Sequence, residues 1–472
     1  MMKKNDSVCA VVEGVGSNGE GIIRHEGVTF FVPYSLPSER VRFKVLKIKG
    51  NIGYGKVEEV LTPAMCRVQP QCEVFEKCGG CCLQHLKYEE QLVHKGNVVK
   101  DALRKIGGLN VEVPCAVASD FPYGYRNKLQ LPIGVDKDGN NVIGFYAERS
   151  HRIIPVDSCE IHPKWAETLI ATLKRYMAET GVSGYDEERK TGVLRHIVAR
   201  EIGGKFIFTL VCAKRKVKGV ERLITMLQEN FADFTLYLNF NDKDTNVIFG
   251  KEFSLVYGDG FFEAEEQGIR YEAGPVTFLQ VNENVREKLY QAALKTVVET
   301  GDEVVVDAYS GGGLLTAMIA KKSKRVYGIE LEQEASDCAD KLKAKNGLTN
   351  MTNICGYVEE RLPFVLNREK SEKLRLILDP PRAGIARSVL KALLQSGIPR
   401  LTIISCNPAT LARDLGVLTG SLKENEKGEL IKNPVYTENG LDGYYQIERI
   451  QPYDMFPQTK HVETLVCLVR KA

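Results

Sequence analysis

Short runs in which apolar and polar positions alternate fill residues 1–62, and glycine turns separate them. Such runs are typical of β-strands, so we predict a small β-barrel of the OB type here. Between positions 40 and 49 the alternation sets Val41, Phe43 and Val45 toward the core. The opposite face carries the basic side chains Arg40, Arg42 and Lys44, continued by Lys47 and Lys49. These charges fit a solvated strand face as well as a face that binds an anionic partner.

The pattern changes twice further along the chain. Residues 63–270 open with a cysteine-rich loop and continue with hairpin-like strands that meet at Gly203-Gly204, which indicates an α+β region. Residues 271–472 alternate apolar strand-like runs with helical ones. This alternation predicts a parallel sheet with helices on both faces, an α/β Rossmann-like domain. The sequence therefore predicts a multidomain protein that divides near residues 62 and 270.

Length and composition set limits on this picture. At 472 residues the chain is too long for a single compact core. No apolar run is long enough for a membrane span and no signal-peptide core follows Met1, so we expect a cytoplasmic protein without a membrane segment. In that reducing compartment the 13 cysteines are better interpreted as metal ligands, catalytic groups or buried fillers than as disulfides. A net charge of +3 permits a nucleic-acid partner without indicating one.

A glycine-rich loop follows the first strand of the alternating region. The strand ends at Asp307 and runs into residues 311–313, three glycines where a ligand can approach the backbone. The next strand ends at Glu330, an acid placed to bond ribose hydroxyls, and a later strand delivers Asp379 to the same edge. A dinucleotide-binding enzyme would share these features. The spacing D-x-x-x-G-x-G, however, resembles the S-adenosylmethionine loop of class I methyltransferases, and the pyrophosphate-binding G-x-G-x-x-G is absent here.

Cys406 lies at the end of the apolar strand LTIIS, directly before Asn407-Pro408 and a helical run. Asparagine is a good N-cap and proline is favoured in the first helical turn, so the thiol should lie beside a helix N-terminus, which favours the thiolate. A lone cysteine at a strand end is commonly a small buried residue. This one shares its sheet edge with Asp379 and the glycine loop, and we therefore interpret it as a nucleophile.

A thiolate nucleophile suits one reaction of nucleic acids. Carbon 5 of uracil is too weak a nucleophile to accept a methyl group directly, but addition of a thiolate to carbon 6 makes carbon 5 electron-rich. A base must then remove the carbon 5 proton before the cysteine can leave. Glu463 opens the final apolar strand and is the best candidate for this base, although a charge at that position would otherwise be unremarkable.

Together these residues resemble the RNA 5-methyluridine methyltransferase family, in particular its 23S ribosomal RNA branch with a TRAM domain and an iron–sulfur cluster. The similarity extends over nearly the whole chain. It rests on the segments FLQVNENV (278–285), DAYSGGG (307–313), DPPRAG (379–384), SCNPATLARDL (405–415) and HVE (461–463). The resemblance implies an S-adenosylmethionine-dependent RNA (uracil-5-)-methyltransferase.

The resemblance also assigns roles to single residues. It implies that Cys406 is the nucleophile and that Glu463 is the base. It implies cofactor contacts at Gln280, Tyr309, Glu330 and Asp379. A further polar contact of the family would fall near Tyr357, where the usual acid or amide is missing, and that position stays unassigned.

Cys72, Cys78 and Cys81 form a C-x5-C-G-G-C pattern, and the resemblance adds Cys159 as a fourth ligand. This three-plus-one layout is more typical of a 4Fe–4S cluster than of structural zinc, which usually takes two short pairs. Zinc stays the alternative. Because methyl transfer needs no electrons, we expect the cluster to be structural or to position RNA.

The resemblance sets the expected substrate as well. The N-terminal barrel is similar to the TRAM domain, an RNA-binding module, and we expect single-stranded or loop RNA whose uridine is flipped out of its stack. We expect 23S ribosomal RNA, because relatives that methylate the T-loop uridine of transfer RNA generally lack the TRAM domain and the cysteine cluster. Transfer RNA is the nearest alternative. A non-catalytic metal-binding RNA-binding protein is another, against which the intact Cys406 and Glu463 argue. A monomer is the default expectation.

Overall fold

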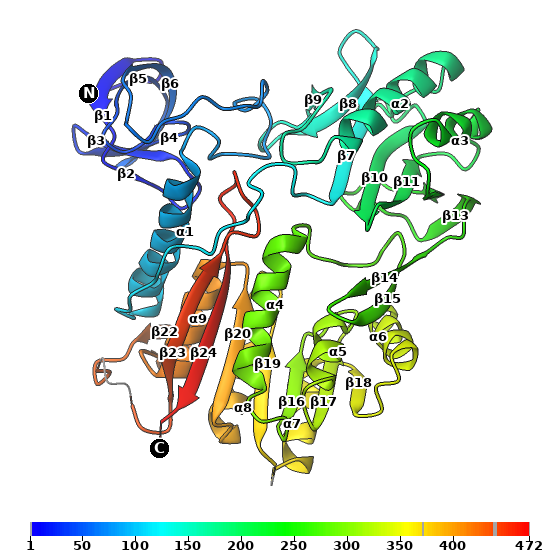
Figure 1. Cartoon of the computed structure of the whole chain (residues 1–472). Coiled ribbons are helices and arrows are strands. Elements are labelled where there is room, and N and C mark those ends of the chain that lie inside the picture. The colour runs from blue at the N-terminus through cyan, green and yellow to red at the C-terminus, as the bar shows by residue number, and fades with distance from the viewer. Residues whose placement is uncertain (1, 371, 438–440, 472) are drawn as a thin grey trace.

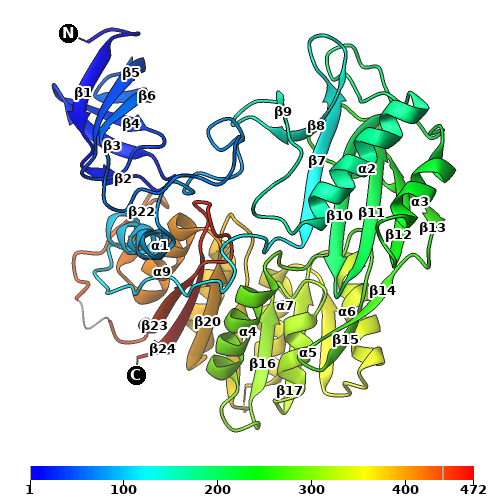
Figure 2. The ribbon, with the colours of Figure 1, turned by 45° about the horizontal axis from the view of Figure 1, so that its top comes forward.

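The computed structural model describes residues 2–370, 372–437 and 441–471. It contains a β-rich N-terminal unit, a central sheet covered by helices, and a C-terminal sheet between helices (Figure 1). In the turned view of Figure 2 the N-terminal unit and the central sheet stand apart from each other above the C-terminal sheet. Among the described residues, no helix combines the length and apolarity that crossing a lipid bilayer requires.

The N-terminal strands form one curled sheet around a small apolar core. The strand order is β1-β5-β6-β4-β3-β2. Val41, Phe43 and Val45 are fully buried, so the alternation expected for this strand is confirmed. Gly53 is required by packing, because a Cβ there would lie 2.3 Å from the ring of Phe30. The strands are β1 (Ser7–Val11), β2 (Gly14–Val15), β3 (Gly21–His25), β4 (Val28–Val32), β5 (Arg40–Lys49) and β6 (Ile52–Thr62).

The basic face of β5 carries acids as well. Arg40 and Arg42 are exposed there and Lys44 is partly buried. The Arg42 guanidinium pairs with Glu59 of the neighbouring strand β6 at 2.7 Å. Exposed pairs of this kind contribute little to stability, but the acid reduces the positive charge that the face offers to a partner.

The central sheet has the order β13-β12-β11-β10-β7-β8-β9. The hairpin between β10 and β11 turns at Gly203 and Gly204, which both have positive φ, and this confirms the expected turn. Helices α2 and α3 pack their apolar side chains on the sheet. The elements are β7 (Lys128–Val135), β8 (Asn141–Tyr146), β9 (Ile153–Pro155), α2 (Trp165–Thr180), β10 (Leu194–Ile202), β11 (Lys205–Cys212), α3 (Val220–Gln228), β12 (Phe234–Phe240) and β13 (Glu252–Tyr257).

A helix and a hairpin from before or around residue 270 pack on the C-terminal sheet. Helix α1 (Tyr88–Ala102), which continues as a π-helical turn (Leu103–Gly107), places Val99 and Leu103 in the same core as the strands of that sheet. The hairpin β14 (Phe262–Glu266) and β15 (Ile269–Ala273) joins a second core on the other face. Both segments fall within the stretch that the expected division assigns largely to the central region.

The C-terminal sheet has the order β18-β17-β16-β19-β20-β24-β23, with a switch point between β16 and β19. Strands β16 to β20 are mutually parallel, as expected, but β24 runs antiparallel to β20 and β23. The strands are β16 (Val304–Ala308), β17 (Arg325–Glu330), β18 (Met351–Cys355), β19 (Leu374–Leu378), β20 (Arg400–Ser405), β23 (Tyr445–Tyr453) and β24 (Glu463–Arg470). A short hairpin, β21 (Leu422–Glu424) and β22 (Leu430–Lys432), precedes the last two.

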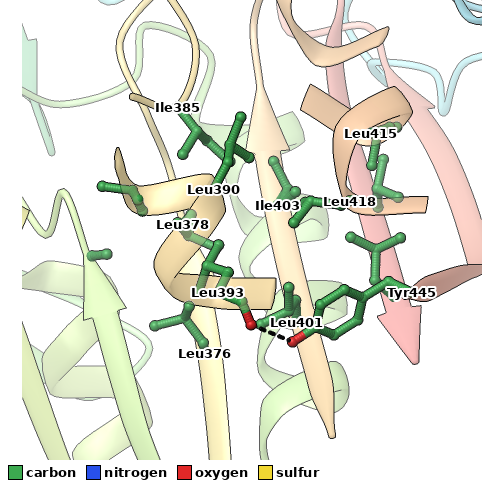
Figure 3. Close-up of a cluster of buried hydrophobic side chains, with 14 of the residues drawn as sticks. Leu376, Leu378, Ile385, Leu390, Leu393, Leu401, Ile403, Leu415, Leu418 and Tyr445 are labelled. Atoms are coloured by element: carbon green, nitrogen blue, oxygen red, sulfur yellow. Dashed lines mark hydrogen bonds between the residues drawn. The ribbon is translucent and has the colours of Figure 1, made fainter. Parts of the chain in front are cut away.

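Helices cover both faces of this sheet, as the alternation predicted. Figure 3 shows one face, where leucines of α8 and α9 pack on β19 and β20. The Tyr445 hydroxyl closes this core by donating to the carbonyls of Ile398, at 2.9 Å, and Leu393, at 3.3 Å. The helices are α4 (Glu283–Val297), α5 (Leu314–Ala320), α6 (Gln333–Lys345), α7 (Val358–Arg368), α8 (Arg387–Ser396) and α9 (Pro408–Thr419).

Candidate active site

A cavity of about 800 Å³ lies at the edge of the C-terminal sheet where its parallel strands end. This is the edge at which open α/β sheets bind ligands. The cavity wall includes the sequence-derived candidates Gln280, Tyr309, Asp379, Cys406 and Glu463. Residues that are far apart in the sequence, from the segment before α4 to the last strand, thus face one space.

The glycine loop after β16 forms part of this wall. Gly313 has a φ of +81°, and a Cβ on it would lie 2.7 Å from Ala339, so only glycine fits. Tyr309 also has a positive φ, 67°, which is unusual for a residue with a side chain and is typical of functional sites. At the base of the loop the Thr316 hydroxyl donates to the buried Asp307 carboxylate at 2.6 Å. Burial, together with the charges of Asp379 and Glu330, raises the pKa of Asp307 to about 7, although the hydrogen bond from Thr316 opposes the shift.

Glu330 lies behind the loop and does not line the cavity. Its carboxylate accepts hydrogen bonds from the N–H groups of Gly311, at 2.8 Å, and Glu332, at 2.9 Å. The acid therefore holds the backbone of the glycine loop in this structure. Tyr357, left unassigned by the sequence, is 52% exposed at the start of α7 and is not part of the cavity wall.

The loop after Asp379 and the helix after Cys406 are joined by hydrogen bonds. Asn407 is the N-cap of α9 and Pro408 its first residue, as expected. The Asn407 side chain accepts from the Ala409 N–H at 3.1 Å and donates to the Arg382 carbonyl at 3.0 Å. Further along α9, Asp414 accepts from the Ile385 N–H at 2.8 Å. Residues of the SCNPATLARDL segment thus hold the DPPRAG segment in place.

The pKa of Cys406 differs from the expectation drawn from the sequence. The helix start was expected to favour the Cys406 thiolate, but the pKa of this thiol is raised. Burial is the largest cause, the charges of Glu463 and Asp379 add to it, and the Arg382 guanidinium opposes it. Burial, with two acidic side chains nearby, therefore outweighs the helix N-terminus. The thiol form is therefore favoured in the free protein.

Glu463, the first residue of β24, is 4% exposed. Burial and the charge of Asp379 raise its pKa to about 8, against the effect of Arg382. Enclosure in the cavity raises the pKa of Asp379 to about 7. A carboxyl group whose pKa lies near neutrality can both accept and release a proton, which suits acid–base catalysis.

Sequence reasoning missed several residues of the cavity wall. Arg126, Lys128 and Arg200 come from the central region, and His461 precedes Glu463 by two positions. The signal for Arg200 was available, because a charge within the buried strand β10 is unusual unless it has a function. Burial, followed by the charge of Arg382, lowers the pKa of His461 to about 4, so its imidazole is neutral at pH 7.

The four candidate metal ligands, Cys72, Cys78, Cys81 and Cys159, come together as free, partly buried thiols. Burial raises the pKa of each, and the charges of Cys78 and Cys72 raise that of Cys159 further, to about 12. In residues 2–370, 372–437 and 441–471, no three His, Cys, Asp or Glu side chains are arranged to hold one metal ion. This geometry therefore shows no metal site at the four cysteines, whether for zinc or for a cluster.

A cluster of several irons spaces its thiolates more widely than one ion does, and backbone amides typically bond its sulfurs. Here the Gly80 N–H donates to Cys78 Sγ at 3.4 Å. Backbone N–H groups also favour the thiolate form of Cys72 and Cys159. These contacts stabilise thiolates, and the iron–sulfur cluster stays a prediction.

Comparison with known proteins shows the family of this chain. Residues 87–439 match the model of the tRNA (Uracil-5-)-methyltransferase family. An uncharacterized RNA methyltransferase of Clostridium tetani is 38% identical, with 99% of this chain and 97% of that protein covered. One from Listeria monocytogenes is 36% identical, with 99% and 98% covered.

Among solved structures, the tRNA (uracil-54, C5)-methyltransferase of Pyrococcus abyssi, in complex with S-adenosyl-L-homocysteine, matches with a TM-score of 0.75 at 24% identity. The match covers 98% of this chain and 99% of that one, so the two share their fold throughout. With a family model that spans most of the chain and relatives of this identity over its full length, the protein belongs to the RNA (uracil-5-)-methyltransferase family of S-adenosylmethionine-dependent enzymes.

Proposed function

We propose that this enzyme methylates carbon 5 of a uridine in 23S ribosomal RNA through a covalent adduct of Cys406. One observation carries the proposal: Cys406, Glu463 and Asp379 face a single cavity at the ligand-binding edge of the C-terminal sheet. Action as a monomer is part of the proposal as the default expectation.

Cys406 and Glu463 divide the chemistry between them. The Cys406 thiolate adds to carbon 6 of the uracil, and the electron pair of the 5,6 double bond moves to an enolate that is rich in density at carbon 5. Bound S-adenosylmethionine supplies an electrophilic methyl group, which carbon 5 accepts. Glu463 then takes the carbon 5 proton, the bond between carbon 6 and sulfur breaks, and the double bond returns.

The proton on Cys406 needs an acceptor before addition can begin. Glu463 acts on the thiol electrostatically and has a pKa of about 8, so its ionised form can serve as that acceptor. Arg382 lowers the pKa of both groups and stabilises the ionised forms. The same carboxylate would need to be deprotonated again before it takes the carbon 5 proton.

Gln280, Tyr309, Glu330 and Asp379 are the proposed cofactor contacts. Three of them line the cavity, and Glu330 shapes the glycine loop through the Gly311 N–H. Phe278, two positions before Gln280, lines the same cavity and is 77% exposed. An exposed aromatic ring at a cavity mouth can stack on a base, which supports a uridine that has been flipped out of its helix or loop.

A second cavity, of about 540 Å³, lies between the N-terminal sheet and the cysteine segment and supports an RNA path there. Its wall includes Phe31 and Tyr54 of the N-terminal sheet, basic residues Lys47 and Lys460, and His461, which also lines the first cavity. Aromatic and basic side chains that surround one groove suit single-stranded RNA. We propose that the N-terminal sheet acts as a TRAM domain in this way.

A 4Fe–4S cluster held by Cys72, Cys78, Cys81 and Cys159 is the second part of the proposal. The cysteine segment bonds to the loop that leads to the cavity residues His461 and Glu463: the N–H groups of Cys82 and Leu83 donate to the Gln458 carbonyl at 3.1 and 3.0 Å. On the other side the Arg126 N–H donates to the Ile161 carbonyl at 2.9 Å. A cluster would therefore hold the loop before Glu463 in position rather than transfer electrons.

Ribosomal RNA is proposed over transfer RNA because the cysteine set resembles that of the ribosomal branch. The N-terminal sheet does not separate the two substrates, since the Pyrococcus abyssi transfer RNA enzyme matches 98% of this chain. That match makes transfer RNA the second candidate. A cytoplasmic location, which follows from either substrate, is proposed with it.

Mass spectrometry of RNA fragments tests the proposal. Anaerobically purified protein and S-adenosylmethionine are incubated separately with 23S ribosomal RNA and with transfer RNA, beside the variant Cys406→Ala and the matched control Cys9→Ala, an exposed thiol. A methyl gain in ribosomal RNA only, lost in Cys406→Ala and kept in Cys9→Ala, is the expected result. Methylation of transfer RNA alone would transfer the assignment to the second candidate. Methylation of neither RNA, with cofactor demonstrably bound, would favour the non-catalytic RNA-binding alternative.

A further inference from the structure

Three cationic side chains occupy the part of the cavity wall that the central region contributes. Lys128 is the first residue of β7, Arg126 lies just before it, and Arg200 is in β10. In the ladder between these strands Arg200 and Lys128 are directly opposite each other. Like charges at such a position repel and destabilise the pair.

No acid forms an ion pair with Arg126, Lys128 or Arg200 among the described residues, and the acid whose charge acts on Arg200 is Glu283. The side chains of Arg126 and Arg200 bond only carbonyl oxygens, those of Lys128 at 3.2 Å and Leu279 at 3.3 Å. The neighbouring Arg286, in contrast, pairs with Glu266 at 2.5 Å. Burial and the charges of Arg200 and Arg126 lower the pKa of Lys128 to about 8. Arg200 is 5% exposed, and burial lowers its pKa to about 10, with a further contribution from Arg286.

The catalytic carboxylates do not serve as counter-ions for this cluster. Among the charges that act on Glu463, the cation is Arg382, and the pKa of Asp379 is raised by burial alone. A buried cation without a partner is costly, so its presence in a cavity wall indicates that the partner arrives with a ligand. The ligand must bring a negatively charged oxygen to this wall.

We propose that Arg126, Lys128 and Arg200 form an oxyanion subsite that holds a backbone phosphate of the RNA next to the reacting uridine; this rests on the proposed function. Guanidinium forks and an ammonium group are the side chains that bind phosphate oxygens best. The carboxylate of the cofactor's methionine moiety has the same chemistry, and Arg200 bonds the residue before Gln280.

A phosphodiester and a carboxylate each carry one negative charge, so position decides between them, and one observation favours phosphate. Arg126 acts electrostatically on His461, which lines both cavities, so the cluster extends toward the proposed RNA path. A phosphate there would fix the strand while the uracil enters toward Cys406, and it would do so without reading the base.

The test compares Lys128→Met with Lys137→Met, which removes the same charge from the exposed turn between β7 and β8. Fluorescence anisotropy measures the Kd of a uridine-containing RNA oligonucleotide over a range of salt concentrations, and calorimetry measures the Kd of S-adenosylhomocysteine. We expect Lys128→Met to bind the RNA about tenfold more weakly, with a salt slope smaller by about 0.7, the value for one phosphate contact on a single strand. Its affinity for S-adenosylhomocysteine should stay within twofold, and Lys137→Met should match the parent protein in both measurements.

A second measurement uses RNA in which a neutral methylphosphonate replaces the phosphate on either side of the uridine. One of the two replacements should weaken binding to the parent protein and have little effect on Lys128→Met, because the two changes remove the same contact. Arg126→Met serves as an independent variant of a partly buried side chain. Circular dichroism and thermal unfolding identify any variant that has lost its fold, and such a variant is replaced by Lys128→Gln.

Two outcomes would overturn the inference. If Lys128→Met weakens S-adenosylhomocysteine and leaves RNA binding and its salt slope unchanged, the oxyanion is the cofactor's carboxylate. If it changes neither affinity, the cluster binds no anion of the reaction. Failure of the proposed function has a different readout. It would be seen as the absence of a covalent adduct between the parent protein and 5-fluorouridine RNA, whatever the binding measurements give.

Discussion

The side-chain Nδ2 of Asn407 donates a hydrogen bond of 3.0 Å to the backbone carbonyl of Arg382. The Oδ1 of the same residue caps α9 by accepting from the Ala409 N–H at 3.1 Å. One side chain therefore fixes both the helix that follows the nucleophile Cys406 and the turn that follows Asp379. The position of the thiol relative to the carboxyl group depends on this residue.

Replacing Asn407 separates these two tasks. Asn407→Ala removes the cap and the tether, and we expect the free energy of unfolding to fall by about 1 kcal/mol. Asn407→Ser keeps an oxygen that can cap the helix but cannot reach Arg382, so its stability should stay close to that of the parent. Both variants should form the adduct with 5-fluorouridine RNA more slowly in single-turnover experiments. A parental adduct rate in Asn407→Ser would show that the tether is not needed.

The raised pKa of Glu463 predicts how the rate of the reaction depends on pH. Its pKa is raised to about 8, mainly by burial, and only the ionised carboxylate can accept a proton. The rate of methyl transfer at saturating RNA should therefore rise with pH up to about 8 and fall away as the pH decreases below that value. Single-turnover rates between pH 6 and 9 measure this.

Glu463→Gln should slow formation of the adduct, because Glu463 is the proposed acceptor of the Cys406 proton. The adduct that does form should stop after the methyl group has been transferred, because no base removes the carbon 5 proton. Ordinary uridine RNA should then accumulate as a methylated covalent adduct, visible as a shifted band on a denaturing gel. The control Glu426→Gln changes an exposed acid of the hairpin region and should release product as the parent does. Free methylated RNA from Glu463→Gln at the parental rate would mean that another group is the base.

The sequence predicted the C-terminal strands well because each is a continuous buried run, such as Val304–Ala308, followed by a turn that carries chemistry. It did not predict that β24 runs antiparallel to β20, since strand direction leaves no mark on the hydrophobic pattern. The packing of α1 on α9 was missed for a related reason, because the partners are far apart in the chain.

For the candidate site, too, some residues could be predicted from the sequence and others could not. Cys406 and Asp379 follow directly from strands of one sheet, so their meeting could be argued from topology alone. Arg126 and Lys128 come from a different sheet, and no local pattern shows that its edge faces the cavity. The pKa of Cys406 is raised by burial and then by the charge of Glu463, and neither cause can be seen in the local sequence.

Glu303 should link stability to pH. Its side chain is fully buried at the start of β16, where it accepts from the Gly301 N–H at 2.8 Å and pairs with Lys373 at 2.8 Å. Bonds from Lys373 and from backbone amides hold its pKa well below the ordinary carboxyl value of 4.5 even though burial opposes them. A lowered folded-state pKa stabilises the fold above the unfolded pKa, and this contribution is lost as the pH falls below about 4.5.

Glu303→Gln keeps the shape of the side chain and removes its charge. We expect its free energy of unfolding at pH 7 to be about 2 kcal/mol lower than that of the parent. The difference should shrink when denaturant unfolding is repeated at pH values from 5 downward. Glu426→Gln again provides the exposed control, and a difference that stays constant with pH would exclude the linkage.

Lys95 and Asp454 form a buried ion pair that joins α1 to the loop before Glu463. Their side chains are 1% and 0% exposed, and the ammonium group also donates to the Phe456 carbonyl at 3.0 Å. Lys95→Met leaves the Asp454 carboxylate buried without a cation, which should lower the free energy of unfolding by about 3–5 kcal/mol. Lys95→Met combined with Asp454→Asn removes the stranded charge, so the double variant should recover part of this loss.

Lys100→Met is the matched control for this pair. Lys100 lies on the same helix and pairs with the exposed Glu112 at 2.7 Å, and an exposed pair contributes no more than about 1 kcal/mol. The coupling energy between Lys95 and Asp454 comes from denaturant unfolding of four proteins: the parent, Lys95→Met, Asp454→Asn and the double variant. A double variant no more stable than Lys95→Met would mean that the loss comes from packing of the long lysine side chain. Recovery would instead show that the charge of Lys95 is what holds the loop of the catalytic base against α1.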